Sequence, residues 1–425
     1  MGAMHSSTQA PENPDARAGP RHWLTRQRLI LYCCAFLSVY LFLAIYLPLT
    51  LKHGADPQGN PLGCDFVVFW SASHLGLGGH AAAAYDPQML FEVERQQALP
   101  QIDFKAQSTW QYPPGFLLLV LPLALLPYFP SLLLYLLGTL AVYAAVVRSI
   151  LPRPGSLLPV LAAPAVFINA GGGQNGFITA ALISAALLSL QSRPAWAGLL
   201  IGLLTIKPQL GLLLPLALIG GRHWRALLFA CLGALAWQGL SLAVLGADTL
   251  QAFLSRLPVV AGWLADGLMP MKKMPTVYAL LRLLGAPAAA AYAAHAVVAF
   301  LAAIAVAWIW WRRLDRSLCY AALIVGTLLV SPYLYDYDLV LLAPALMWFA
   351  EYALRRGWKR GEREVMVVAW LMPGLVVALY ALLHVQLAVL ALLALFGVIL
   401  RRGWEEWRKA GPPLPTPALQ DAGSA

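Results

Sequence analysis

Long apolar stretches separated by short polar segments dominate this chain. The clearest cover residues 29–51, 132–150, 226–245 and 288–311. Each is close to the roughly 20 residues that an α-helix needs to cross the hydrocarbon core of a membrane. The stretches are continuously apolar, whereas the strands of a membrane barrel would alternate between apolar and polar residues. The pattern therefore predicts an all-α polytopic membrane protein.

Further apolar runs are shorter or interrupted. Residues 116–126 are too few to cross alone, and we expect a re-entrant or interfacial piece there. Two short pieces, 195–206 and 210–219, are hinged at Lys207-Pro208-Gln209. The remaining expected crossings are 157–170, 177–190, 318–334, 339–354, 365–383 and 385–400. Together these runs predict about 12 transmembrane helices with both termini on the same side.

Composition and charge support this interpretation. Of 425 residues, 60% are hydrophobic and 11% are charged, against roughly 25% charged residues in a soluble domain. The net charge of +10 comes from Arg and Lys at the ends of apolar runs. This placement is typical of cytoplasmic loops and sets the topology of the chain. We therefore expect no nucleic-acid partner.

The same trace predicts three regions. Residues 1–28 and 405–425 are expected to be disordered cytoplasmic tails, and residues 29–404 a transmembrane domain. Within that domain, residues 52–114 form a large first outer loop, with a surface helix at about 87–99, and residues 248–287 form a second outer segment. The five cysteines have no spacing that indicates a metal site or a disulfide framework.

Isolated polar residues at breaks between apolar runs are the candidates for chemistry, because ionisable groups at membrane depth are costly. Asp65 follows the first run closely and Lys207 lies at the Pro hinge. Other candidates at breaks are Gln174, Asn175, Asp336 and Asp338. The trace places them near one outward-facing cavity.

Each candidate also has a structural interpretation. Asp65 could anchor the loop, and Lys207 could extend its ammonium group to the membrane surface. The three glycines at 171–173 could form only a turn, since no P-loop spacing follows them. Tyrosines 333, 335 and 337 are typical of an aromatic belt at the membrane–water interface.

Several short motifs, taken together, resemble glycosyltransferase family 87. They are Asp65-Phe-x-x-Phe-Trp70, Tyr85-Asp86-Pro87, Trp110-x-Tyr112-Pro113-Pro114, Gly173-Gln174-Asn175-Gly176, Ile206-Lys207-Pro208-Gln209 and Ser331-Pro332-Tyr333 with Tyr337-Asp338-Leu339. The resemblance covers about residues 29–349. At Tyr333 this chain departs from a histidine that some relatives have, which puts a donor-phosphate contact at that position in doubt.

The resemblance implies a GT-C fold and an inverting hexosyltransferase, of the EC 2.4.1 type, that uses a polyprenyl-phosphate-linked sugar. Mannosyltransferases are the best-described members. A lipid or glycan would be the acceptor, as in glycolipid biosynthesis, at the periplasmic face of a bacterial inner membrane. Neither a nucleotide nor a metal is expected as cofactor, and a monomer is favoured.

The resemblance also assigns roles to residues. Asp65 would be the general base, and Lys207 would supply a cation to the leaving phosphate, assisted by Gln174, Asn175, Lys272 or Lys273. Tyr112 and Trp70 could stack on sugar rings. The substrate-binding set further includes Tyr333, Asp336 and Asp338.

Two other classes of function remain open. A polytopic transporter, or a flippase for lipid-linked sugars, would carry charged residues within several spans. Here the acidic residues gather on the outer side instead. A structural assembly subunit would not need so many lone polar residues at helix breaks.

Overall fold

The computed structural model describes residues 22–50, 55, 61–104 and 107–410. These residues form helices joined by short loops, and no β-strand occurs among them beyond a single bridge between Ala55 and Pro61. The all-α prediction is therefore confirmed. Most of the two predicted tails, residues 1–21 and 411–425, and part of the first loop lie outside the described residues.

The helices have the following bounds: α1 Arg26–Thr50, α2 Phe66–Leu77, α3 Pro87–Val93, α4 Pro114–Val120, α5 Tyr128–Arg148, α6 Leu158–Leu161, α7 Pro164–Gly172, α8 Gly176–Ser189, α9 Pro194–Leu203, α10 Leu214–Gly220, α11 Trp224–Leu245, α12 Ala247–Ala265, α13 Val277–Leu283, α14 Ala288–Trp311, α15 Arg316–Val330, α16 Leu342–Arg356, α17 Glu362–Leu383 and α18 Ala388–Ala410. Several short 3-10 turns join them, at Ala81–Tyr85, Leu121–Leu125, Leu204–Ile206, Pro208–Gly211, Met271–Lys273 and Asp336–Leu341.

Five helical stretches in the described part of the chain are long and apolar enough to cross a membrane. They are α1, α5, α11, α14 and the stretch Asp336–Arg356, which contains α16. Shorter apolar helices lie between them, including the two pieces on either side of Lys207. A multi-pass membrane protein is therefore supported, while the predicted total of about 12 crossings stays a prediction.

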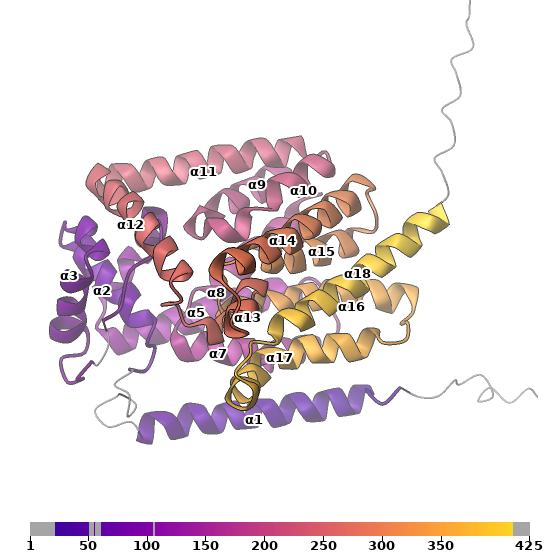
Figure 1. Cartoon of the computed structure of the whole chain (residues 1–425), viewed down its shortest axis with the longest axis horizontal. Coiled ribbons are helices and arrows are strands. Elements are labelled where there is room, and N and C mark those ends of the chain that lie inside the picture. Colours follow the sequence, from indigo (N-terminus) through magenta and orange to yellow (C-terminus); the bar gives the residue numbers. More distant parts are fainter. Residues whose placement is uncertain (1–21, 51–54, 56–60, 105–106, 411–425) are drawn as a thin grey trace, which may run out of the picture.

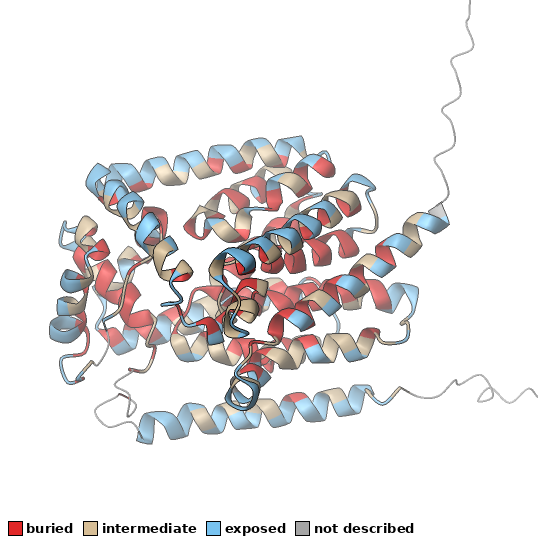
Figure 2. Cartoon of the chain, in the orientation of Figure 1, coloured by how far each residue is buried: buried red, intermediate tan, exposed pale blue. Residues whose placement is uncertain are grey.

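The long helices run side by side, with α11 along one edge of the molecule and α1 along the opposite edge (Figure 1). Both edge helices are largely exposed, whereas α15 and much of α16 are buried (Figure 2). Apolar side chains on the edge helices suit contact with lipid, because hydrocarbon tails are as apolar as leucine. The core of the bundle therefore lies around α8, α15 and α16.

The bundle has two chemically different ends. One end, called here the first-loop end, carries α2 and α3 (Figure 1). The other end, called the basic end, is where α1 begins at Arg26, α5 ends at Arg148 and α16 ends at Arg356. This separation agrees with the clustering of basic residues on one side of the predicted trace.

Three segments differ from their predictions. Residues 157–170 form two short helices, α6 and α7, because Pro164 cannot continue the helix before it. The second outer segment contains a 19-residue helix, α12. Hydropathy did not predict this helix, because polar residues interrupt its apolar positions. Helix α18 continues to Ala410, so residues 405–410 of the predicted C-terminal tail are helical.

Candidate active site

Asp65 lies directly before α2, where the chain enters the bundle from the first loop. Its side chain makes no capping hydrogen bond to that helix. Its backbone N–H instead donates to the carbonyl of Gly172, with 3.0 Å between the nitrogen and the oxygen. The Asp65 backbone is therefore fixed to the end of α7, and its carboxylate has Gln174 as a side-chain hydrogen-bond partner.

Gly172 and Gly173 allow this close approach. A Cβ atom on Gly172 would lie 2.6 Å from Oδ2 of Asp65, and one on Gly173 would lie 2.6 Å from Cβ of Phe66. Gly173 also has a φ of +68°, in the left-handed region that favours glycine. The glycine run, which from the sequence could have been only a flexible turn, is thus the surface against which Asp65 packs.

Two buried amide side chains, Asn169 before the glycines and Gln174 after them, continue the site. The side chain of Asn169 holds this loop, because Nδ2 donates to the Gln174 carbonyl at 3.2 Å and Oδ1 accepts from the Gly176 N–H at 2.9 Å. Gln174 lies beside Asp65, and its Oε1 accepts from the Tyr112 hydroxyl at 3.2 Å. The loop therefore links the first-loop segment to the bundle core.

Lys207 and Asp338 form a buried ion pair next to this loop. The Lys207 Nζ donates to Oδ1 of Asp338 at 2.5 Å and to Oδ1 of Asn175 at 3.3 Å. The two side chains are 2% and 1% exposed. Lys207 therefore does not reach the membrane surface, and a protein carboxylate already balances its charge.

Three tyrosines, each in contact with the next, extend from this pair. The ring of Tyr337 lies 4.5 Å from the Lys207 Nζ and stacks on Tyr335. Tyr333 packs edge-on against Tyr335 and donates to the Gln111 side chain. All three are half-buried, and their membership of an aromatic belt stays a prediction.

The first loop is tied down by its own motifs. The Asp86 side chain caps α3 by accepting from the backbone N–H groups of Gln88 and Met89. The Tyr85 hydroxyl donates to the Tyr112 carbonyl at 2.8 Å, and the Arg256 Nε donates to the Tyr85 carbonyl at 2.8 Å. These bonds place the Tyr112 hydroxyl at Gln174.

Lys272 and Lys273 are exposed on a short turn before α13. Lys273 interacts electrostatically with both Asp65 and Asp336, and Asp336 is half-buried. The Lys272 carbonyl accepts from the Gln386 side chain at 2.8 Å, which joins this turn to the segment before α18. Lys273 is therefore a solvent-accessible cation whose charge acts on the Asp65 carboxylate.

Trp70 does not belong to this group. It is buried in the packing of α2, its Nε1 donates to the Leu126 carbonyl at 2.9 Å, and its ring stacks on His74. The structure thus brings together Asp65, Gln174, Asn175, Lys207, Asp338, Tyr112, Tyr333, Asp336 and Lys273. Sequence reasoning missed Asn169, whose only signal is its position two residues before a glycine run.

The electrostatics of Asp65 suit a base. Burial raises the pKa of its carboxyl above the ordinary value for aspartate, and Lys273, Gln174 and Lys207 offset part of that rise. A carboxylate with a raised pKa takes up a proton more readily, which is what general-base catalysis requires. No group of three His, Cys, Asp or Glu side chains that could hold a metal ion occurs among the described residues.

A cavity of about 310 Å³ borders the site. Its walls come from Gln111, Tyr333, α12 and α14, and they are mostly apolar. Arg256 of α12 lines the same cavity. A space of this kind admits an apolar chain beside the polar residues just described.

Comparison with known proteins identifies one family. The sequence model of glycosyltransferase family 87 matches residues 110–332, more than half of the chain. The matched range contains Tyr112, Gln174, Asn175 and Lys207, while Asp65 and Asp338 lie outside it. No curated protein and no solved structure matches the chain.

Proposed function

The chain belongs to glycosyltransferase family 87, and on that premise we propose that it transfers a hexose, mannose in the simplest case, from a polyprenyl phosphate to a hydroxyl of a lipid or glycan. The observation that carries this proposal is the position of the Asp65 carboxylate, which packs against Gly172 and lies beside Gln174. The positive charge of Lys273 acts on the same carboxylate. The site combines a base, hydrogen-bonding amides and an accessible cation at one end of a membrane bundle.

The proposed reaction is a single displacement. The acceptor oxygen attacks the anomeric carbon while its proton passes to the Asp65 carboxylate. The bond between that carbon and the phosphate oxygen breaks, and its electron pair leaves with the polyprenyl phosphate. Attack opposite to the leaving group inverts the configuration of the sugar. Neither a nucleotide nor a metal takes part.

The leaving phosphate gains negative charge in this step and needs a cation more than a proton. Because Lys207 is buried and paired with Asp338, we give this role to Lys273, which is exposed and acts electrostatically on Asp65. Lys207 then acts as a positioning residue, because its second hydrogen bond holds Asn175. Tyr112 and the tyrosines around Lys207 offer aromatic faces for the sugar.

The cavity between Gln111, Tyr333 and α12 suits the first isoprene units of the donor. A donor that arrives through the membrane also explains the setting that we propose, a bacterial inner membrane with the site on the periplasmic face. Nucleotide sugars stay in the cytoplasm, whereas a polyprenyl chain carries a sugar to the other face.

The test is transfer by membranes that contain the full chain. Radiolabelled polyprenyl-phosphate hexoses are offered one at a time, and labelled products are separated from the donor. We expect product from one of them, and a loss of at least a hundredfold in Asp65→Asn, since the amide cannot accept the proton. Asp103→Asn, an exposed residue of the same loop, is the matched control and should keep full activity.

Two results would contradict the proposal. Unchanged turnover in Asp65→Asn would remove Asp65 as the base. Movement of labelled donor across sealed vesicles without any transferred sugar would favour the alternative, a transporter or flippase.

A further inference from the structure

A second cavity lies at the basic end of the molecule, far from Asp65. Its volume is about 970 Å³, at the upper end of the roughly 300–1,000 Å³ range of small-molecule sites. The first turns of α1 form one wall, and α6, α16 and α17 form the others. Helix α1 packs mainly against α6, so the space opens along the edge of the bundle.

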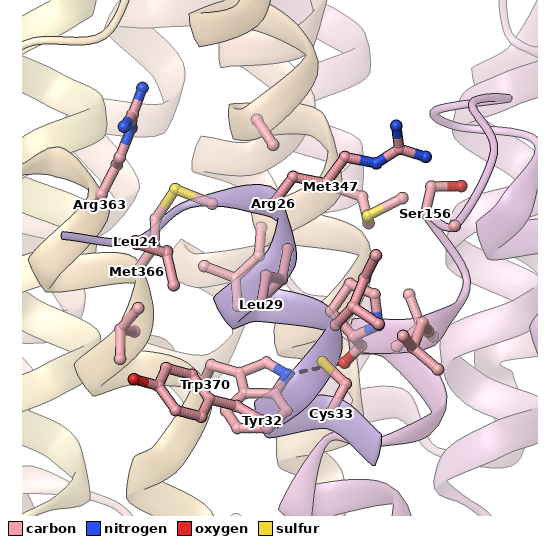
Figure 3. A pocket seen from close by; sticks show the side chains of 18 of the residues that line it. Leu24, Arg26, Leu29, Tyr32, Cys33, Ser156, Met347, Arg363, Met366 and Trp370 are labelled. Carbon is pink, nitrogen blue, oxygen red and sulfur yellow. Dashed lines mark hydrogen bonds between the residues drawn. The ribbon is translucent and has the colours of Figure 1, made fainter. Parts of the chain in front are cut away.

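The interior of this cavity is apolar. Leu29 and Cys33 of α1 face Met347 of α16 and Met366 and Trp370 of α17 (Figure 3). The Trp370 Nε1 is already satisfied by the Pro159 carbonyl at 2.7 Å. The buried Ser156 hydroxyl, which also lines the cavity, has no hydrogen-bond partner among the described residues. The side chains of Leu29, Met347 and Met366 offer only apolar surface, so hydrocarbon is the matching occupant of most of the interior.

Three arginines line the same cavity, namely Arg26, Arg153 and Arg363. Figure 3 shows the guanidinium groups of Arg26 and Arg363 toward one edge of the pocket, with Cys33 and Trp370 toward the other. Arg363 lies over the ring of Trp358. No ion pair with a carboxylate joins any of these arginines to the described part of the chain.

The carboxylates at this end are already engaged. Arg355 binds both Asp315 and Glu351, and Arg402 binds the buried Glu362. Three more acidic groups have partners of their own: Glu364 with His22, Glu405 with Lys359, and Glu406 with the Asp315 backbone N–H. The three pocket arginines are therefore left with positive charge that an external anion could balance.

This cavity is separate from the candidate active site. It surrounds the beginning of α1, whereas Asp65 follows the end of that helix. A helix of 25 residues is about 37 Å long. A single sugar-lipid headgroup cannot reach both places.

We propose that this cavity binds an anionic glycerophospholipid, with its acyl chains against Leu29, Met366 and Trp370 and its phosphate at Arg26, Arg153 and Arg363. The match of an apolar interior with an unpaired basic rim carries the assignment. Basic pockets between membrane helices on the positively charged side of a protein are suited to anionic headgroups. The lipid fastens the loosely packed α1 to the bundle.

The experiment measures lipid retained by the full chain. Protein is purified into micelles that contain equal amounts of phosphatidylglycerol and phosphatidylcholine with the same acyl chains, and the bound lipids are counted by native mass spectrometry. The natural chain should retain phosphatidylglycerol in preference. The double variant Arg26→Gln with Arg153→Gln should lower that preference by about tenfold or more, since each arginine favours an anionic lipid by about 1 kcal/mol.

Matched controls separate local from general effects. Arg193→Gln with Arg225→Gln removes the same charge from exposed residues outside the cavity and should keep the preference. Ala350→Phe, which fills the cavity from α16, should reduce retention of both lipids with all arginines in place. Size-exclusion chromatography checks that each variant is folded.

Three results would overturn the proposal. Equal retention of the two lipids by the natural chain would do so without any variant. Equal losses in the two double variants would make the effect one of net charge. Displacement of phosphatidylglycerol by added polyprenyl phosphate would assign the cavity to an isoprenoid instead.

Discussion

The ammonium group of Lys207 lies 2.5 Å from a carboxylate oxygen of Asp338, and both side chains are almost completely buried. Each of these charges would be costly alone in such a place. As a pair they join the hinge after α9 to the turn before α16, and through Asn175 they fix the loop beside Asp65. The site is thus organised around a neutralised lysine.

This pairing predicts that either partner alone is harmful. Lys207→Met leaves Asp338 buried without its cation, and Asp338→Leu leaves Lys207 without its anion. Each should lower the free energy of unfolding by about 3–5 kcal/mol. The double variant should recover most of that loss, because removing both charges is often nearly neutral. Thermal unfolding of the four proteins in one detergent gives the comparison.

The reverse result is also informative. Single variants as stable as the natural chain would show that the pair contributes no net free energy. A double variant with the sum of both losses would indicate that each side chain acts independently.

The close packing of Gly172 against Asp65 predicts that a larger residue at position 172 slows the transfer reaction. In Gly172→Ala the new Cβ would lie 2.6 Å from Oδ2 of Asp65, so the carboxylate must move. Displacing a catalytic group by about 1 Å can cost on the order of a hundredfold in rate. We expect kcat to fall by about that factor while the melting temperature changes little. Gly171→Ala is the control, since its Cβ would meet open space, and it should retain kcat.

The effect of Lys273 on Asp65 predicts that removing the lysine charge changes the pH dependence of the transfer rate. The positive charge of Lys273 lowers the pKa of Asp65 and offsets part of the rise caused by burial. In Lys273→Gln that offset is lost, the Asp65 pKa rises further, and more of the carboxylate is protonated at a given pH. The acid limb of the pH–rate profile should therefore move to higher pH, and kcat at neutral pH should fall about tenfold or more.

Lys272→Gln serves as the control for this prediction. Lys272 is also exposed, and the substitution keeps its backbone carbonyl, which accepts a hydrogen bond from the Gln386 side chain. An identical shift in both variants would indicate a general surface-charge effect. No shift in Lys273→Gln would exclude Lys273 as the neighbour of the base.

The burial of Glu94 predicts that the free energy of unfolding falls as pH rises. The residue is fully buried, and burial raises the pKa of its carboxyl from 4.5 to about 7, with Ser108 offsetting only part of the rise. Between these values the folded chain keeps a proton that the unfolded chain has released. The free energy of unfolding should decrease from about pH 4.5 to about pH 7 and stay low above it, by up to about 3 kcal/mol.

Glu94→Gln removes the titration at nearly constant shape. The variant should be more stable than the natural chain at pH 8, and the two should converge near pH 5. Unfolding curves at several pH values test this. Parallel pH dependence in both proteins would mean that another group titrates.

Hydropathy predicted the long helices well, because an apolar run of membrane length has few alternatives to a spanning helix. The bounds of α14 match the predicted run 288–311. Helix α12 was missed for the opposite reason. It contains Asp248, Arg256 and Pro258, so its sequence resembles a loop although one of its faces lines a cavity.

The site was predictable as a set of residues but not as a geometry. Ionisable groups at helix breaks singled out Asp65, Lys207 and Asp338, since such groups are rare at membrane depth. Their partners depend on tertiary contacts between distant segments, which no local pattern encodes. The sequence therefore assigned Lys207 to the substrate, whereas the fold gives it to Asp338.

The separation of that pair along the chain affects how the protein is made. Lys207 precedes Asp338 by 131 residues, and a ribosome adds about 5–20 residues each second. For on the order of ten seconds after its synthesis, Lys207 has no partner for its charge, because Asp338 has not yet been translated. Closure of the bundle around Lys207 must therefore be one of the last events of biogenesis, after the helix that carries its counterion has been translated.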